Sequence, residues 1–398
     1  MKIFLSLITL LFTSLLYATE LKIASYNVEN LFDMKYSGRE YDAYIPNRHN
    51  WTLSNYKKKL LNISEVICGI DADIIALQEI ENENVLKALQ KSLKRVGCNY
   101  KYRAITHKKI SAIQQAILSK KPIQSTRELK VGYKLGLRPI LEAKFMIEGR
   151  ALYIYVNHWK SKASKEPQRM VSAKVLKKRL LQLPKESEYI LIGDFNSNYN
   201  EDELIGSSTG LNTTLNSVNE NKIQQKIFAH YNLWLELPIY KRWSHNFYGD
   251  KQGLDAILLP HTLFDGRGVD YVNDSFYVFK KSYLFHKKGY IFRWVYKKNR
   301  HRGEGYSDHL PVVATFSTKP YRYLPSTVRL EKEVKVISKD KKRAWIKLKN
   351  REKILIYGGV KDLYVGKKYD ISIYSEQIYK GEREIIDFKI EKRYDDKK

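Results

Sequence analysis

The sequence predicts an α/β domain followed by a smaller domain built from strands alone. From Leu21 to about residue 318, apolar runs typical of strands alternate with longer amphipathic stretches typical of helices. Beyond Pro320 the runs are short, alternate between apolar and polar residues, and carry no helix pattern. At 398 residues the chain also exceeds the size at which one hydrophobic core usually stops growing. We therefore expect domains at 19–320 and 325–398.

The strands and helices of the first domain can be placed from these runs. Strands are expected at 21–24, 74–77, 116–118, 140–147, 152–156, 190–192 and 312–314, and a further apolar run lies at 256–259. The fourth and fifth are separated by Glu148-Gly149-Arg150, which predicts a hairpin. Helices are expected at 54–68, 84–96 and 168–183, the first of them burying Leu60, Leu61, Ile63, Val66 and Ile67. A segment at 269–302, rich in Tyr, Phe, Lys and Arg, is interpreted as a surface insertion whose ends return to the site.

The second domain should contain about five strands. They are expected at 334–337, 344–348, 354–357, 369–374 and 385–390. Their spacing resembles that of an OB-fold, a small β-barrel that often carries single-stranded nucleic acid on a basic, aromatic surface. Residues 319–398 hold 23 Lys and Arg against 13 Asp and Glu, so this domain is basic in its own right. A purely structural module that braces the first domain is the alternative.

The amino terminus has the features of a secretory signal peptide. Lys2 precedes an apolar run at 3–16, and Ala18 is a small residue before the polar Thr19. The run is shorter than the roughly 20 residues of a membrane-spanning helix, and no other segment is long or apolar enough. We expect a signal peptide at 1–18, export to the periplasm or the medium, and no stable membrane insertion after cleavage. An uncleaved anchor is the alternative.

Two cysteines, Cys68 and Cys98, each lie near the end of a predicted helix. An exported location permits a disulfide, but two buried free thiols are equally compatible with the sequence. We expect no zinc site built on these two cysteines.

The formal net charge of +28 and the pI near 9.7 predict an anionic partner. Nucleic acid comes first, and acidic lipid or envelope polymer second. A compositional habit of the source organism is the alternative explanation, because Lys and Tyr are abundant along the whole chain.

Six short motifs place polar side chains where predicted strands end or begin. They are Ser25-Tyr26-Asn27, Leu77-Gln78-Glu79, Asn157 to Lys162, Gly193 to Asn196, Leu254-Asp255 and Ser307 to Pro311. Phosphodiester hydrolysis needs a cation, a group that activates water and a group that stabilises the leaving oxygen. The amides, carboxylates and imidazoles of these motifs can supply all three. Each motif alone is also explained by turn or cap chemistry, but six polar strand ends together are not.

In this order the motifs YNVEN, LQE, NHWKSK, GDFN, LD and SDH resemble the endonuclease/exonuclease/phosphatase superfamily. The resemblance covers roughly residues 21–318 and is strongest to bacterial extracellular nucleases. It implies a deoxyribonuclease I-like, four-layered α/β sandwich. It also implies that Asn27 and Glu79 bind a divalent metal with help from Asp308, most simply Mg²⁺, with Mn²⁺ or Ca²⁺ as alternatives.

The same resemblance implies roles for the remaining polar residues. His309 would act on the attacking water or the phosphate with Asp255 orienting its ring, and Asp194 is the rival for water activation. Asn196 would hold a phosphate oxygen, and His158 would stabilise the pentacovalent state or protonate the leaving oxygen. Arg138, Lys160 and Lys162 are candidates for phosphate contacts, with plain surface cations as the alternative.

The function predicted from the sequence is an exported, metal-dependent nuclease that cuts DNA, and RNA as a second substrate, with little sequence preference. One alternative is a phospholipid or sphingomyelin phosphodiesterase of the same fold, for which 276–296 could form an exposed apolar membrane loop. Another is a nucleic-acid-binding protein without catalysis. The other histidines lack metal-ligand spacing and are interpreted as structural or exposed: His49, His107, His230, His245, His261, His286 and His301.

Overall fold

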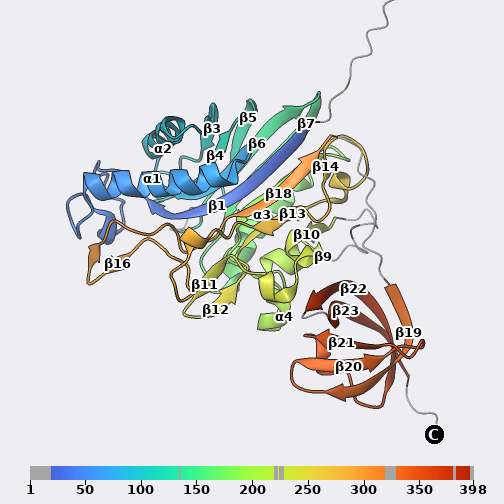
Figure 1. The fold of residues 1–398 in the computed structure, drawn as a ribbon. Helices are drawn as coiled ribbons and strands as arrows, with labels where there is room; N and C mark the ends of the chain where they lie inside the picture. Colours follow the sequence, from blue (N-terminus) through green and yellow to red (C-terminus); the bar gives the residue numbers. More distant parts are fainter. Residues whose placement is uncertain are drawn as a thin grey trace, which may run out of the picture.

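The computed structural model describes residues 19–133, 136–218, 228–318, 329–379 and 382–394, together with Ile223. The predicted signal peptide at 1–18 lies outside the described residues. Figure 1 shows a large α/β unit, which holds the chain from β1 to β18, and a smaller unit of strands near the carboxyl terminus. Among the described residues, none of the helices combines the length and apolarity that crossing a membrane requires.

Two seven-stranded sheets form the α/β unit. The first has the order β14 (Asp270–Tyr271), β18 (Val312–Ser317), β1 (Glu20–Leu31), β2 (Ile74–Ile80), β4 (Gln114–Ser119) and β3 (Tyr102–Ile105), with β15 (Tyr277–Val278) pairing with β18. The second has the order β5 (Ile123–Leu129), β6 (Ile140–Ile147), β7 (Arg150–His158), β8 (Glu188–Asp194), β13 (Asp255–Leu259), β10 (His230–Asn232) and β9 (Ser217–Val218). Every strand predicted in this unit is present, as is the β6–β7 hairpin, in which Ile147 pairs with Arg150.

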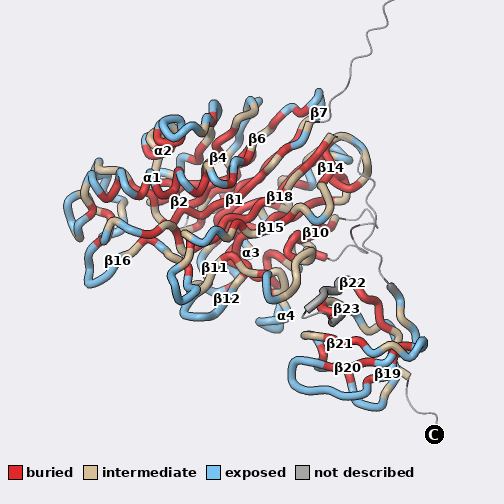
Figure 2. Tube along the Cα trace, viewed as in Figure 1, coloured by how far each residue is buried: buried red, intermediate tan, exposed pale blue. Residues whose placement is uncertain are grey.

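The alternation of side chains along β1 divides the interior into two cores. Leu21 and Ile23 belong to the core that the first sheet shares with the second, whereas Ala24 and Val28 belong to a core with the helices. The helices are α1 (Leu53–Ile70), α2 (Glu83–Arg95), α3 (Glu166–Leu180) and the short α4 (Glu201–Ile205). Figure 1 shows α1 and α2 together on one face of the first sheet, and Figure 2 shows the buried residues following the strands.

The predicted helices are confirmed, with one error in their buried faces. α1 begins after Thr52, whose side chain accepts a hydrogen bond from the amide of Asn55, and α2 is capped by Asn82. Leu61, however, is 50% exposed, so its prediction as a core residue is wrong. The helix places it on the solvent side, between Leu60 and Ile63, which are buried.

The prediction of a surface insertion at 269–302 is wrong in part. β14 and β15 in this segment pair with β18 and so extend the first sheet. Phe276, Phe279 and Trp294 are at most 4% exposed and belong to the two cores. These three side chains therefore complete the fold and are not exposed to a membrane, whereas Tyr290 in the same segment is 54% exposed.

Cys68 and Cys98 form a disulfide, with their Cα atoms 5.7 Å apart. The bond joins the last turn of α1 to the segment after α2. This decides between the two states that the sequence left open, and it ties together the two helices that cover the first sheet.

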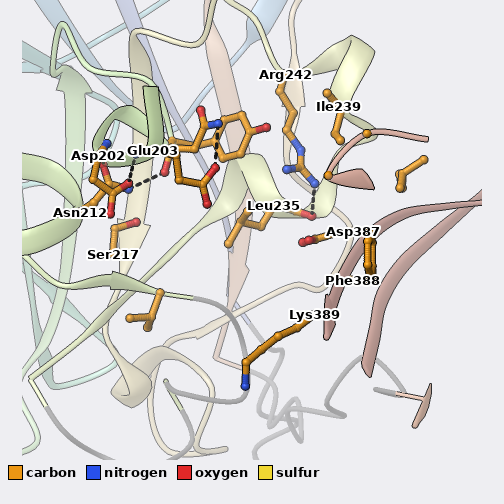
Figure 3. Close-up of a pocket in the computed structure, with 16 residues that line it drawn as sticks. Asp202, Glu203, Asn212, Ser217, Leu235, Ile239, Arg242, Asp387, Phe388 and Lys389 are labelled. Atoms are coloured by element: carbon orange, nitrogen blue, oxygen red, sulfur yellow. Dashed lines mark hydrogen bonds between the residues drawn. The ribbon is translucent and has the colours of Figure 1, made fainter. Parts of the chain in front are cut away.

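The carboxyl-terminal strands close into a barrel of order β19-β20-β21-β23-β22. They are β19 (Arg329–Lys339), β20 (Arg343–Lys347), β21 (Lys353–Tyr357), β22 (Lys368–Tyr379) and β23 (Glu382–Tyr394), around a core of its own. A pocket of about 440 Å³ lies between this barrel and the α/β unit. Figure 3 shows Ile239 and Arg242 on one side of this pocket and Asp387 and Phe388 on the other. None of the predicted catalytic side chains lines it.

Two small two-stranded sheets complete the described structure. They are β11 (His245–Phe247) with β12 (Asp250–Gln252), and β16 (Tyr296–Lys297) with β17 (Arg300–His301). The β11–β12 hairpin lies beside the cavity described next, because His245, Phe247 and Gln252 all line it.

Candidate active site

The catalytic candidates meet where strands of both sheets end on one side of the molecule. β1 and β2 are parallel and bring Asn27 and Glu79 to this edge, while β8 brings Asp194. β13 runs antiparallel to β8, so that Asp255 at its start pairs with Asp194. Beside these strand ends lies a cavity of about 450 Å³ whose lining includes Glu79, His158, Asp194, Asn196, Asp308 and His309.

Gly193 allows the strands of the second sheet to approach closely at this edge. Its φ is +134°, and a Cβ at this position would lie 2.1 Å from the carbonyl oxygen of Asn157. A side chain would therefore push β7 and β8 apart next to His158 and Asp194.

Two β-bulges aim the groups around Glu79. The register of β1 against β2 shifts between Asn27 and Leu31, and Glu79 itself has a φ of +69°. Its Oε2 accepts a hydrogen bond from the backbone N of Asn30 at 2.8 Å, and its Oε1 accepts one from Nδ2 of Asn27 at 3.2 Å. Bulges re-aim side chains, and strained backbone is concentrated at functional sites. The two predicted metal ligands are thus in direct contact.

Asp308 lies on the same acidic side and is paired with Arg293. The Arg293 guanidinium is 3.3 Å from Oδ2 of Asp308 and also binds the buried carboxylate of Glu29. Burial opposes ionisation of Asp308, but the cations of His309 and Arg293 hold its pKa below the usual value. Burial raises the pKa of Glu79, and the carboxylate of Asp308 raises it further. Neither Glu29 nor Arg293 was among the predicted site residues.

His309 is held by a buried carboxylate. Its Nδ1 is 2.7 Å from Oδ2 of Asp255, and the Ser244 hydroxyl donates to the same oxygen at 2.6 Å. Its Nε2 points toward Asp194, 3.9 Å from Oδ2. Burial opposes a charged ring, but the carboxylates of Asp255 and Asp194 raise the pKa of His309 well above its ordinary value. Burial raises the pKa of Asp194 to about 7, and His309 offsets this only in part.

His158 lies on the other side of Asp194. Its Nε2 is 3.6 Å from Oδ2 of Asp194 and 3.7 Å from Oε1 of Glu79. Within the described part of the chain, its buried Nδ1 has no hydrogen-bond partner. Burial lowers the pKa of His158 well below its ordinary value, and the positive charges of Arg138 and His309 add to this effect. The ring is therefore neutral.

Of the residues predicted to contact phosphate, most line the cavity and one does not. Asn196 and Arg138 both line the cavity and both donate to the carbonyl oxygen of Trp159, at 3.3 and 3.0 Å. Lys162 also lines the cavity, but its ammonium is paired with Glu201 at 2.7 Å. Lys160 is not among the lining residues, and its ammonium lies against Gly136.

His245 is a site residue that the sequence interpretation placed among structural or exposed histidines. It forms a β-bridge with His309, and the two ring centroids are 4.8 Å apart. Spacing gave no signal, because the contact depends on how the β11–β12 hairpin meets the segment before β18. His245, Asp308 and His309 also have side-chain nitrogen and oxygen atoms close enough together to hold a metal ion.

Comparison with known proteins gives one family. A model of the endonuclease/exonuclease/phosphatase family matches residues 22–318, a range that contains all the candidates from Asn27 to His309. Among solved structures, D. rerio TDP2 humanized by 14 mutations is 16% identical, covering 75% of this chain and 98% of that chain with a TM-score of 0.49. A family protein from Leptotrichia buccalis C-1013-b is 17% identical, covering 74% and 99% with a TM-score of 0.46. No curated protein matches the sequence.

Proposed function

Because the chain belongs to the endonuclease/exonuclease/phosphatase family, we propose that it is a divalent-metal-dependent phosphodiesterase that hydrolyses DNA with low sequence specificity. One observation carries the proposal. Asp194 lies between two imidazoles of opposite charge preference, at 3.6 Å from His158 and 3.9 Å from His309, in a cavity that it shares with Glu79. Perturbed acids and bases gathered in one cavity are typical of catalytic sites.

The residues at the acidic side fit a hard divalent cation. The Asp308 carboxylate is close enough to raise the pKa of Glu79. Asn27 donates its Nδ2 to Glu79 while its Oδ1 accepts from the backbone N of Glu29, so its amide would have to rotate to offer an oxygen to the ion. Oxygen donors of this kind suit Mg²⁺, with Mn²⁺ or Ca²⁺ as alternatives. When bound, the ion would neutralise phosphate charge and acidify water.

The proton chemistry would be divided between Asp194 and His309. Asp194 has a pKa of about 7 and is therefore suited to accept the proton of the attacking water near neutral pH. His309, held by Asp255 at 2.7 Å, would stay protonated and stabilise negative charge on the phosphate. Asn196 and Arg138 would contact phosphate oxygens from the cavity wall. The neutral His158 would act at the leaving oxygen.

The choice of DNA over lipid rests on charge and on the burial of residues 276–296. The chain has a net charge of +28, and each phosphate that it neutralises would release counterions. Phe276, Phe279 and Trp294 are buried, so the largest apolar side chains of this segment are not offered to a membrane, although Tyr277, Tyr290 and Tyr296 are at least 39% exposed.

The barrel would contribute DNA affinity as an OB-like domain. Its closed five-stranded architecture and the surplus of ten positive charges in residues 319–398 favour this role over bracing alone. Removal of residues 325–398 should weaken DNA binding and flatten its dependence on salt. Unchanged binding by the truncated protein would favour the bracing role.

The direct test is incubation of the mature protein with circular DNA, linear DNA, RNA and sphingomyelin vesicles, with Mg²⁺ or with chelator. The proposal expects Mg²⁺-dependent degradation of DNA. It also expects that Asp194→Ala abolishes degradation while leaving DNA binding largely intact. Turnover of sphingomyelin alone would assign the lipid alternative, and binding without any cleavage would assign a non-catalytic role.

Export is the remaining part of the proposal. The signal-like sequence at 1–18 and the Cys68–Cys98 disulfide both suit an oxidising compartment outside the cytoplasm. Mass spectrometry of the protein recovered from periplasm and medium should find Thr19 as the first residue and both thiols resistant to alkylation. An unprocessed chain with two free thiols would contradict export.

A further inference from the structure

A row of four aromatic rings leads from the candidate catalytic histidine to the protein surface. The centroid distances are 4.8 Å from His309 to His245, 6.5 Å from His245 to Phe247, and 4.6 Å from Phe247 to Tyr248. The rings of His245 and Phe247 are nearly parallel, at 13°. The row therefore follows the β11 strand outward from the cavity.

The outer end of this row is exposed, and its backbone is unusual. Phe247 is 56% exposed and Tyr248 is 93% exposed. Tyr248 has a φ of +49° and Gly249 a φ of +96°, so the hairpin turns through two left-handed residues. A bulky side chain in this conformation is uncommon, and a smaller residue would fit the turn better. The fold thus keeps a large ring at a position that favours Asn or Gly.

The hairpin is fixed to the catalytic centre. The backbone N of Leu310 donates to the carbonyl oxygen of Ser244 at 2.7 Å, and the N of Ser244 donates to that of Gln252 at 3.0 Å. These bonds tie both hairpin strands to the segment that carries His309. The ring row consequently has a set position relative to the bond that would be cut.

Lysines surround the base of the hairpin. The ammonium of Lys280 is 3.8 Å and that of Lys251 is 4.9 Å from the ring centroid of Trp243. Burial and the neighbouring charges of Lys251 and Lys241 together lower the pKa of Lys280 to about 8, so these ammonium groups repel one another. A phosphate placed among them would relieve that repulsion.

We propose that the β11–β12 hairpin is a stacking platform for unpaired bases next to the scissile phosphodiester, and that the enzyme acts on single-stranded or frayed DNA in preference to continuous duplex. The inference rests on the proposed function, whose substrate class it narrows. Exposed rings can stack on bases only where the base faces are uncovered, and those faces are covered inside a duplex. Lys251 and Lys280 would meet the phosphates of the same strand.

The test compares three variants on three substrates. Tyr248→Ala removes the outer ring, and Tyr248→Trp keeps a ring. Tyr102→Ala is the control, because Tyr102 lies on β3, the edge strand at the far end of the first sheet from β18. The substrates are a labelled single-stranded oligonucleotide, the same strand in a blunt duplex, and bis(p-nitrophenyl) phosphate, which has no bases. Binding of both oligonucleotides is also measured by fluorescence anisotropy in chelator.

Wild-type protein should bind and cleave the single strand better than the duplex. Tyr248→Ala should weaken single-strand binding, and lower kcat/KM for the single strand relative to that for bis(p-nitrophenyl) phosphate, by about tenfold, the effect of losing one stacked base. Tyr248→Trp and Tyr102→Ala should resemble wild type. Equal losses on all three substrates, or no loss in single-strand binding, would overturn the platform.

Two further outcomes separate this inference from the proposed function. If the single strand is bound through Tyr248 but no phosphodiester is hydrolysed, the proposed catalysis fails and the platform stands. If Tyr248→Ala instead reduces binding to sphingomyelin vesicles and leaves single-strand binding unchanged, the hairpin contacts membranes and the platform is wrong.

Discussion

The two histidines that flank Asp194 have opposite surroundings although they share one cavity. Nδ1 of His309 is bound to Asp255 at 2.7 Å, whereas Nδ1 of His158 has no partner among the described residues. Both Nε2 atoms face the same Asp194 oxygen, at 3.9 and 3.6 Å. The pKa of His309 is raised and that of His158 is lowered, so one ring is a cation and the other is neutral.

The comparison shows that the group bound to Nδ1 decides the charge of each ring more than the Asp194 carboxylate near Nε2 does. Both rings are buried, and burial alone disfavours the imidazolium. His158 also has a second carboxylate, Glu79, but on the same Nε2 side at 3.7 Å, whereas only His309 has a carboxylate on its Nδ1, Asp255 at 2.7 Å. The Ser244 hydroxyl donates to the same Asp255 oxygen at 2.6 Å. A cation next to a neutral ring gives the site one group that stabilises charge and one that can exchange a proton.

Removal of His309 should have the largest effect. His309→Ala should lower kcat on DNA by about 10³-fold, within the range for loss of a positioned group that stabilises charge in the transition state. The measurement is plasmid nicking under saturating Mg²⁺, with DNA binding in chelator as a check on folding. His261→Ala is the matched control, because His261 follows the far end of β13 from Asp255. Undiminished nicking by His309→Ala would show that the charged His309 is not needed for catalysis, and the comparison with His158 would then have no functional meaning.

Replacement of Asp255, the partner of His309, should make the His309 ring more like the neutral His158 ring. Asp255→Asn should lower kcat by about 10²-fold, because the imidazolium loses the carboxylate that stabilises it. The pKa of His309 should fall, so that the ring loses its positive charge at a lower pH than in the wild-type protein. NMR titration of the imidazoles in chelator measures this directly, with His158 expected to be neutral at neutral pH because its pKa lies well below the ordinary value. A His309 titration that is unchanged in Asp255→Asn would show that Asp194 alone sets the charge.

The catalytic candidates at the strand ends were predictable from the sequence, whereas most of the residues that contact them were not. Asp194 and Glu79 follow apolar runs, and parallel strands bring their carboxyl ends to one edge. Asp255 could be placed beside His309 only through family resemblance. His245 and Arg293 gave no signal, because their contacts depend on a hairpin and on a long segment that crosses the molecule.

The bulges show a second limit of sequence prediction. Asn30 contributes its backbone N to Glu79, and both Glu29 and Asn30 have positive φ angles near the end of β1. Neither residue is a glycine, so their residue types do not predict the positive φ angles. The segment at 269–302 failed for a related reason, since the pairing of β14 and β15 with β18 is not encoded by local alternation.

Ser244 offers a smaller perturbation of the same histidine. Ser244→Ala leaves Asp255 in place but removes the hydroxyl that donates to its Oδ2 at 2.6 Å. Loss of one hydrogen bond to a buried carboxylate costs about 1.5–3 kcal/mol, part of which should appear as a decrease in kcat of about tenfold. Asp255 would then bind His309 more strongly as its only close donor, so the His309 pKa should not fall. A fall equal to that of Asp255→Asn would mean that Ser244 positions the carboxylate instead of sharing it.

The smallest expected effect comes from a third buried histidine outside the site. His230 donates or accepts through Nε2 and the Tyr189 hydroxyl at 2.9 Å, and burial lowers its pKa to about 4. Because the unfolded chain takes up this proton near pH 6.5 and the folded chain does not, stability should fall as pH decreases from 6.5 toward 4. Between pH 7 and 5.5 the contribution is about 1 kcal/mol. Urea unfolding of wild type and His230→Gln at both pH values measures it, the variant being expected to lose less stability on acidification. Equal losses would mean that burial without a carboxylate does not keep an imidazole neutral in this protein, and the same explanation would then fail for His158.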